Sequence, residues 1–292
     1  MRVRIQEAGA AAGLTKKAIA YYEAQRLVVP AVLSNGYRDF SAQDVARLRR
    51  IAVLRQLGLD VAAIRDVLRD ETGDALRVLA ARGALRQREA QTRQALLARL
   101  SRDGDYAGIE AELRALEQGM VIAQRLLDAF PGYYGRFIAL HFAQFLQQPV
   151  CTAEEADAYR AVTAFLDDVP PLDIPQDLQD FLAQSAADID AEAINGMLAQ
   201  NRRAVENPEA FLEEHREALA QYIAFRQSDA YRQSPAGRLQ VLLRAFNRAS
   251  GYDTVFLPAM RRLSPAYAAY CAQLQTANEK LLAQHPETAS WT

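Results

Sequence analysis

Residues 13 to 23 of the chain read Gly13-Leu14-Thr15-Lys16-Lys17-Ala18-Ile19-Ala20-Tyr21-Tyr22-Glu23. A glycine followed by a threonine, whose hydroxyl can cap the first turn, predicts that a helix begins at this point. Residues three or four apart share a helix face, so Ala18, Ile19 and Tyr22 can pack inward with Leu27. The segment therefore predicts a short amphipathic helix after a first helix over residues 6–12. Its outer face would carry Lys16, Lys17, Ala20 and Tyr21.

A small β-hairpin is expected after this helix. Residues 28–40 contain two short apolar runs on either side of Asn35-Gly36, and Asn-Gly is the strongest short hairpin signal. Ser41 with Asp44 three residues on resembles a capping box and predicts the start of another helix, which Gly58 would end. A further helix is expected over residues 61–68. Together these elements predict a winged helix-turn-helix domain over residues 1–72.

The remainder of the chain reads as helix. Residues 73–103 predict one long charged helix, whose apolar positions recur at spacings of three and four but are interrupted by polar residues. The polar, glycine-containing stretch at residues 101–105 marks the expected boundary to an all-helical effector or regulatory domain over residues 104–292. Prolines at 208, 235 and 265 each follow Asn or Ser, a pattern typical of helix starts. We therefore expect a mainly α protein.

The charge is distributed unevenly along the 292 residues. Residues 1–100 hold 18 basic and 10 acidic side chains, a balance of +8, whereas residues 101–292 hold 16 basic and 26 acidic ones, a balance of −10. This asymmetry predicts an anionic partner for the head, with the body facing away from it. No apolar run approaches the ~20 residues that span a bilayer, and no apolar signal region opens the chain, so we expect a cytoplasmic protein without membrane contact.

The residue types of metal sites and catalytic centres are present but not clustered. Cys151 and Cys271 lie far apart, and none of His141, His215 and His285 has the spacing of a ligand set. No glycine-rich phosphate loop and no nucleophile elbow is found. We expect no metal, no cofactor and no enzymatic activity.

Aromatic residues are concentrated between residues 130 and 146. The segment contains six aromatic residues, and Phe137, His141 and Phe145 share one helix face, with Tyr134 and Phe142 on the adjoining face. Packing in a core explains such a stripe, because aromatic side chains bury large areas. An aromatic-lined effector pocket explains it as well. The residues of this alternative are Tyr133, Tyr134, Phe137, His141, Phe142 and Phe145.

The ordered segments of the head resemble the DNA-binding domain of the MerR family of bacterial transcription regulators. The resemblance rests on residues 13–23, on Arg26-Leu27-Val28-Val29-Pro30, on Asn35-Gly36-Tyr37-Arg38-Asp39-Phe40-Ser41 and on Leu54-Arg55-Gln56-Leu57-Gly58-Leu59. Ala20 departs from the family pattern, which has arginine before the tyrosine pair, so base readout there is expected to differ. Thr-Lys-Lys-Ala-Ile is also found in a subgroup with a large all-helical C-terminal extension. The resemblance implies DNA contacts by Thr15, Lys16, Lys17, Tyr21, Tyr22, Tyr37, Arg38 and Arg49.

The same resemblance implies a mode of action. It implies a homodimer joined by an antiparallel coiled coil at about residues 74–101, bound to a pseudo-palindromic promoter operator in double-stranded DNA. It also implies distortion of that DNA so that bacterial RNA polymerase can engage the promoter.

Two functions for the body stay open at this point. One is a response to a small hydrophobic or peptide effector. The other is a helical module that recruits a protein or peptide, with no small-molecule effector. A DNA-tethered enzyme is a third hypothesis, for which the sequence offers no catalytic cluster.

Overall fold

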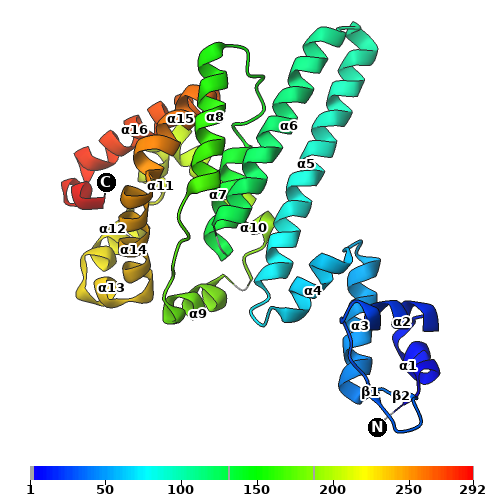
Figure 1. Cartoon of the computed structure of the whole chain (residues 1–292). Helices are drawn as coiled ribbons and strands as arrows, with labels where there is room; N and C mark the ends of the chain where they lie inside the picture. The colour runs from blue at the N-terminus through cyan, green and yellow to red at the C-terminus, as the bar shows by residue number, and fades with distance from the viewer. Residues whose placement is uncertain (1–2, 131, 187, 292) are drawn as a thin grey trace. The chain divides into compact units, whose positions relative to one another are not determined.

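The computed structural model describes residues 3–130, 132–186 and 188–291. These residues form two compact units, the first ending at Leu76 and the second beginning at Arg77 (Figure 1). Helices dominate both units, and the described sheet has two strands. The expected mainly α class is thereby confirmed.

The described residues of the first unit that precede α5 (Asp74–Asp103) form four helices and a hairpin. Their bounds are α1 (Ile5–Ala12), α2 (Lys16–Ala24), β1 (Ala31–Val32), β2 (Arg38–Asp39), α3 (Ala42–Gln56) and α4 (Val61–Arg69).

Local chemistry sets the helix ends of this unit. Gly13 has a φ of 66°, a left-handed conformation that glycine adopts without strain, and it turns the chain from α1 into α2. The Thr15 hydroxyl accepts a hydrogen bond from the Ala18 amide at 3.1 Å, and so caps α2 as the sequence predicted. The Ser41 hydroxyl likewise accepts from the Asp44 amide, while the Asp44 carboxylate accepts from the Ser41 amide. This capping box was also predicted.

The inward face of α2 forms the centre of the first unit's core. Ile19 and Tyr22 are buried there, together with Phe40 of the wing and Leu48 and Ile64 of the later helices. The base of the wing, away from its turn, is held by Val3, which pairs with Phe40 in an isolated antiparallel bridge. The predicted amphipathic orientation of α2 is confirmed.

The wing is a short antiparallel hairpin. Ala31 lies opposite Asp39 and Val32 opposite Arg38, and the Leu33 amide donates to the Tyr37 carbonyl at 2.9 Å. Gly36 has a φ of 79°, which explains the preference for glycine at this place in the turn. The hairpin was predicted, but its strands are only two residues long each.

The long helix α5 (Asp74–Asp103) belongs to the second unit from Arg77 onward. Gly104, with a φ of 64°, reverses the chain into α6 (Tyr106–Ala129), and the two helices run side by side in opposite directions (Figure 1). Arg82 pairs with Asp128 at 2.6 Å, Arg93 approaches Glu117 at 3.6 Å, and Arg99 pairs with Glu112. Residues 101–105, expected as a domain boundary, therefore include the turn of a helical hairpin inside this unit.

The core of the second unit joins α6 and α7 (Gly132–Ala143) to α5 and to α8 (Ala153–Asp168), α10 (Ala191–Glu206), α15 (Leu257–Leu263) and α16 (Pro265–Gln284). Residue 131, in the segment proposed as a helix stop, lies outside the described residues. Asn207, Ser234 and Ser264 cap helices that begin at the following prolines, as predicted. The remaining elements are α9 (Gln176–Ser185), α11 (Pro208–Glu214), α12 (Arg216–Gln227), α13 (Asp229–Gln233), α14 (Pro235–Ser250), a π-helical turn (Tyr252–Phe256) and a 3₁₀ helix (Pro286–Trp291).

Candidate DNA-binding surface and effector region

The outer face of α2 is a basic, solvent-exposed surface. Lys16, Lys17 and Ala20 are exposed, and Tyr21 is 51% exposed. No described acidic side chain pairs with either lysine. Their positive charge is therefore available to a phosphate or another anion. Tyr22 is buried, and most of its ring packs in the core.

An open groove runs along α2. Thr15, Lys17, Tyr21 and Tyr22 line it together with Arg55 and with residues 60–62, where α4 begins. The Arg55 guanidinium also donates to the Leu59 carbonyl at 2.6 Å, which fastens the turn between α3 and α4. Sequence reasoning did not place residues 60–62 at this surface, because they reach α2 only through tertiary packing.

The wing carries a basic residue, Arg38, that forms an ion pair with α2. Arg38 Nε donates to both carboxylate oxygens of Glu23, at 2.7 and 2.6 Å. Tyr37 is 63% exposed, and the Arg4 guanidinium lies 5.8 Å from the centre of its ring. The ion pair fixes the wing relative to the C-terminal end of α2 and leaves Arg38 half-exposed. Arg4 is a further basic residue of this surface that sequence reasoning did not select.

Arg49 has a structural contact. Its Nε donates to the Ala11 carbonyl at 2.8 Å, so α3 holds the last turn of α1. Arg47 acts similarly on the Leu27 carbonyl at 2.5 Å. Helix ends leave carbonyls without intrahelical partners, and arginine side chains are suited to satisfy them. Arg49 remains exposed, so its other guanidinium nitrogens face solvent.

Two helices joined by a glycine turn, an outward basic helix and a two-stranded wing define a winged helix-turn-helix domain, a class of DNA-binding module. Residues 3–71 match the family described as "MerR HTH family regulatory protein". The N-terminal domain of this chain is a MerR-family helix-turn-helix domain.

Two curated proteins are similar to this domain. The HTH-type transcriptional regulator HmrR of Rhizobium leguminosarum bv. viciae is 42% identical over 66 residues, which are 23% of this chain and 51% of HmrR. The HTH-type transcriptional regulator CueR of Yersinia pestis is 36% identical over 67 residues, which are 23% of this chain and 48% of CueR. The chain thus spans about half the length of the curated relatives it matches. No solved structure matches the chain significantly.

The aromatic residues proposed for an effector pocket lie on α7 and after its end, and they pack against other rings. Phe142 is 2% exposed, and its ring meets those of Phe256 and Tyr267 at 5.1 and 5.3 Å. Phe145 is also buried. Tyr134 meets Phe130 edge-on, and Phe137 contacts Tyr133 at 6.0 Å. The core alternative describes this arrangement, and the pocket alternative stays a prediction.

Polar groups of the same cluster are kept uncharged. Burial, and secondarily the charge of Arg202, lowers the pKa of His141 to about 4, so its ring is neutral at pH 7. Burial raises the pKa of Tyr134, although Asn247 and Tyr252 hydrogen-bond with it. The Tyr133 hydroxyl is 3.7 Å from the Met197 sulfur. These groups provide no acid–base pair.

The described residues hold no metal cluster, disulfide or membrane-spanning helix. No three histidine, cysteine or acidic side chains there lie close enough together to hold a metal ion. Cys151 is exposed and Cys271 is partly buried, and neither forms a disulfide. No described helix is long and apolar enough to cross a membrane.

Proposed function

We propose that the chain is a dimeric, sequence-specific DNA-binding transcription regulator that responds to an effector. The observation that carries this proposal is the outward basic face of α2 in a MerR-family domain, whose two lysines have no acidic partner among the described residues. HmrR and CueR are named as transcriptional regulators, and they share this domain with the chain.

The geometry of α2 supports a role in the major groove. A recognition helix contacts base edges through its N-terminal residues, and here those are Thr15, Lys16 and Lys17. The lysines supply affinity for phosphates at any sequence. Because Ala20 is too short to reach a base edge with a polar group, Tyr21 and the shape of the DNA carry more of the discrimination at this point.

The proposed dimer places two such helices on two half-sites of an operator. Leu97 on α5 supports it, because this large apolar side chain is 66% exposed in the single chain and could be covered by a partner helix. Since α5 already packs against α6, its remaining face would form the contact. Distortion of promoter DNA and recruitment of RNA polymerase belong to the same proposal.

The proposal is tested by selecting genomic fragments that bind the purified full-length chain, and by footprinting the selected DNA. We expect protection of a pseudo-palindromic site whose two halves are one helical turn apart, or a multiple of that distance. Light scattering of the free protein should give a dimer mass, and Leu97→Glu should lower it. A protein that selects no sequence, or protects a single half-site as a monomer, would contradict the proposal.

A further inference from the structure

A cleft in the second unit lies between α5, α7 and α10. Its volume is about 470 Å³, and its walls carry the amide side chains of Gln87, Gln91, Gln144 and Asn195 beside Arg88 and Arg202. The volume falls within the range of small-molecule sites. No carboxylate lines the cleft among the described residues.

The two arginines give this cleft a positive charge that the described residues do not neutralise. The half-buried Arg88 side chain forms no side-chain hydrogen bond and no ion pair with the described residues. Arg202 donates to the Gln144 side-chain oxygen at 3.1 Å, and its guanidinium lies over the Phe145 ring at 5.6 Å. Burial lowers the pKa of Arg88, and the charge of Arg202 lowers it further. Two guanidinium groups that repel each other are thus held beside one cavity.

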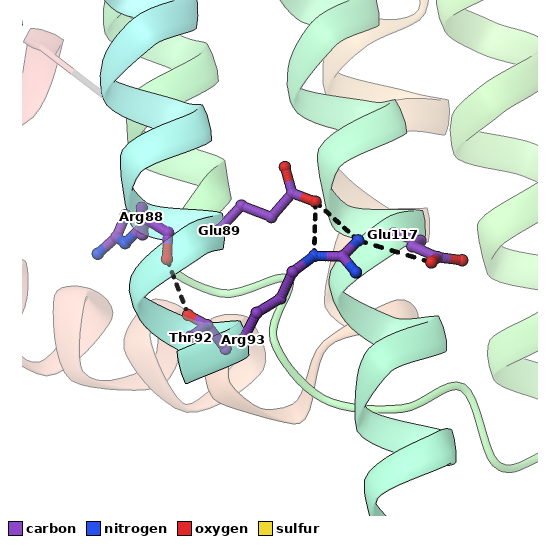
Figure 2. Close-up of polar contacts among 5 residues, drawn as sticks. All are labelled: Arg88, Glu89, Thr92, Arg93 and Glu117. Atoms are coloured by element: carbon purple, nitrogen blue, oxygen red, sulfur yellow. Dashed lines mark hydrogen bonds and ion pairs between the residues drawn. The ribbon is translucent and has the colours of Figure 1, made fainter. Parts of the chain in front are cut away.

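Arg88 differs from the arginines of α5 that pair with carboxylates. Arg93, on the same helix, pairs with Glu89 at 2.8 Å and approaches Glu117 of α6. Figure 2 shows that Arg88 points away from this group, so Glu89 and Glu117 do not neutralise it. Arg82 and Arg99 also have carboxylate partners on α6. Arg86 and Arg102 of α5 also have no carboxylate partner among the described residues, but both are exposed and neither lines the cleft. Arg88 combines the lack of a partner with partial burial beside the cavity, which is the position of a cation that a ligand can reach.

We propose that this cleft binds a small molecule that carries a carboxylate or a phosphate, with Arg88 and Arg202 as the two charged anchors. Guanidinium groups bind both oxyanions through paired, charge-assisted hydrogen bonds. The four amides supply further donors and acceptors for the rest of the ligand. The buried side chains of Leu85 and Leu140 provide apolar wall.

The cleft would be the effector site of the regulator, an inference that rests on the proposed function. A ligand there would join α5 to α7 and α10 by relieving the repulsion between Arg88 and Arg202. Since α5 is the helix proposed to pair two protomers, ligand binding would bias the arrangement of the dimer.

The test measures anion binding to the full-length chain by equilibrium dialysis and thermal unfolding, with inorganic phosphate and with citrate as probes. Chloride at matched ionic strength is the reference. We expect the unfolding temperature to rise by about 3 °C at ten times Kd for at least one probe. A response to phosphate alone or to citrate alone identifies the class of oxyanion.

The variant R88Q/R202Q should lose this response. The matched control is R86Q/R203Q, because Arg86 and Arg203 are exposed residues on the same two helices and do not line the cleft. Without any probe, R88Q should be as stable as the wild type or more stable, since it removes like-charge repulsion. Circular dichroism verifies that the variants fold.

The inference is overturned if neither probe stabilises the wild type beyond chloride, or if R88Q/R202Q responds as the control does. Binding of each protein to the selected DNA is measured in parallel. DNA binding without an anion response removes this inference alone. An anion response without DNA binding removes the proposed function, and leaves the cleft as an anion site.

Discussion

The two units of the chain use their basic side chains differently. In the first unit, Lys16 and Lys17 extend from α2 into solvent without acidic partners among the described residues. In the second unit, arginines such as Arg82 and Arg99 pair with carboxylates of the neighbouring helix. Exposed ion pairs contribute little stability, at most about 1 kcal/mol each, but they cancel charge. Unpaired cations therefore indicate where an anionic partner binds when they also lie beside a cavity. In the second unit Arg88 and Arg202 meet both conditions, whereas Arg86 and Arg203 form no ion pair with the described residues but do not line the cleft.

The largest expected effect concerns the core of the second unit. Phe142→Ala should lower the free energy of unfolding by about 3–5 kcal/mol, because the buried ring meets several others and its loss leaves a cavity. Urea unfolding followed by circular dichroism measures it, with Tyr222→Ala on the exposed face of α12 as the control. If Phe142→Ala costs less than the control, the ring lines an open pocket, and the effector alternative for this cluster gains support.

Acid should destabilise the second unit through His141. Its pKa is about 4 in the folded chain, below the ordinary 6.5, so the unfolded state takes up a proton first as the pH falls. The contribution of the neutral His141 to the free energy of unfolding is fully present above pH 6.5. It is lost as the pH falls from 6.5 to 4, which lowers the free energy of unfolding by about 3 kcal/mol. His141→Gln should lack this component.

The measurement is the free energy of unfolding of both proteins at pH 7 and pH 4.5. The wild type should lose clearly more stability than His141→Gln over this interval. Equal losses would mean that the imidazole is accessible to water in the folded chain, contrary to a packed cluster.

The basic face of α2 is tested by Lys16→Ala with Lys17→Ala. Removing two phosphate contacts should weaken binding to the selected DNA by roughly 10–100-fold at moderate salt, and should reduce the salt slope by about 2 per protomer. Fluorescence anisotropy over a range of salt concentrations measures both. Lys280→Ala, which removes the ion pair of α16 with Glu209, is the control in the second unit. An unchanged slope in the double variant would show that these lysines do not touch phosphate.

The smallest expected effects concern Arg38, which can act by pairing with Glu23 or by contacting DNA. Breaking its pair with Glu23 should cost less than about 1 kcal/mol of stability, because both side chains are partly exposed. If Arg38 also contacts DNA, Arg38→Ala should weaken DNA binding roughly threefold to tenfold, whereas Glu23→Gln should leave it equal or stronger. Equal weakening by both variants would mean that Arg38 acts only by holding the wing.

Much of the first unit follows from interactions between near neighbours in the sequence. Gly13 turns the chain, Thr15 caps α2, and Ser41 with Asp44 begins α3, each through contacts within four residues. Caps and periodic faces were predictable because the partners are close along the chain. The alternation of Ile19 inward and Tyr21 outward was predictable for the same reason.

The contacts that could not be predicted join distant segments. Arg38 reaches Glu23 and Arg49 reaches the Ala11 carbonyl, so two residues selected for DNA also hold the domain together. The hairpin of α5 and α6 decides which arginines meet carboxylates. The spacing of residues 74–101 alone did not show that α6 would cover one side of α5.

The sequence by itself determined a MerR-type head, its caps, its basic outer face and a helical body, since these depend on residue type and short-range spacing. Only the tertiary structure decided which cations keep a free charge. Arg88 and Arg93 are both arginines on α5, yet their positions around the helix direct one into an amide-lined cleft and the other toward Glu117 of α6. That distinction depends on how helices pack, because packing brings residues far apart in the chain within range of each other's charge.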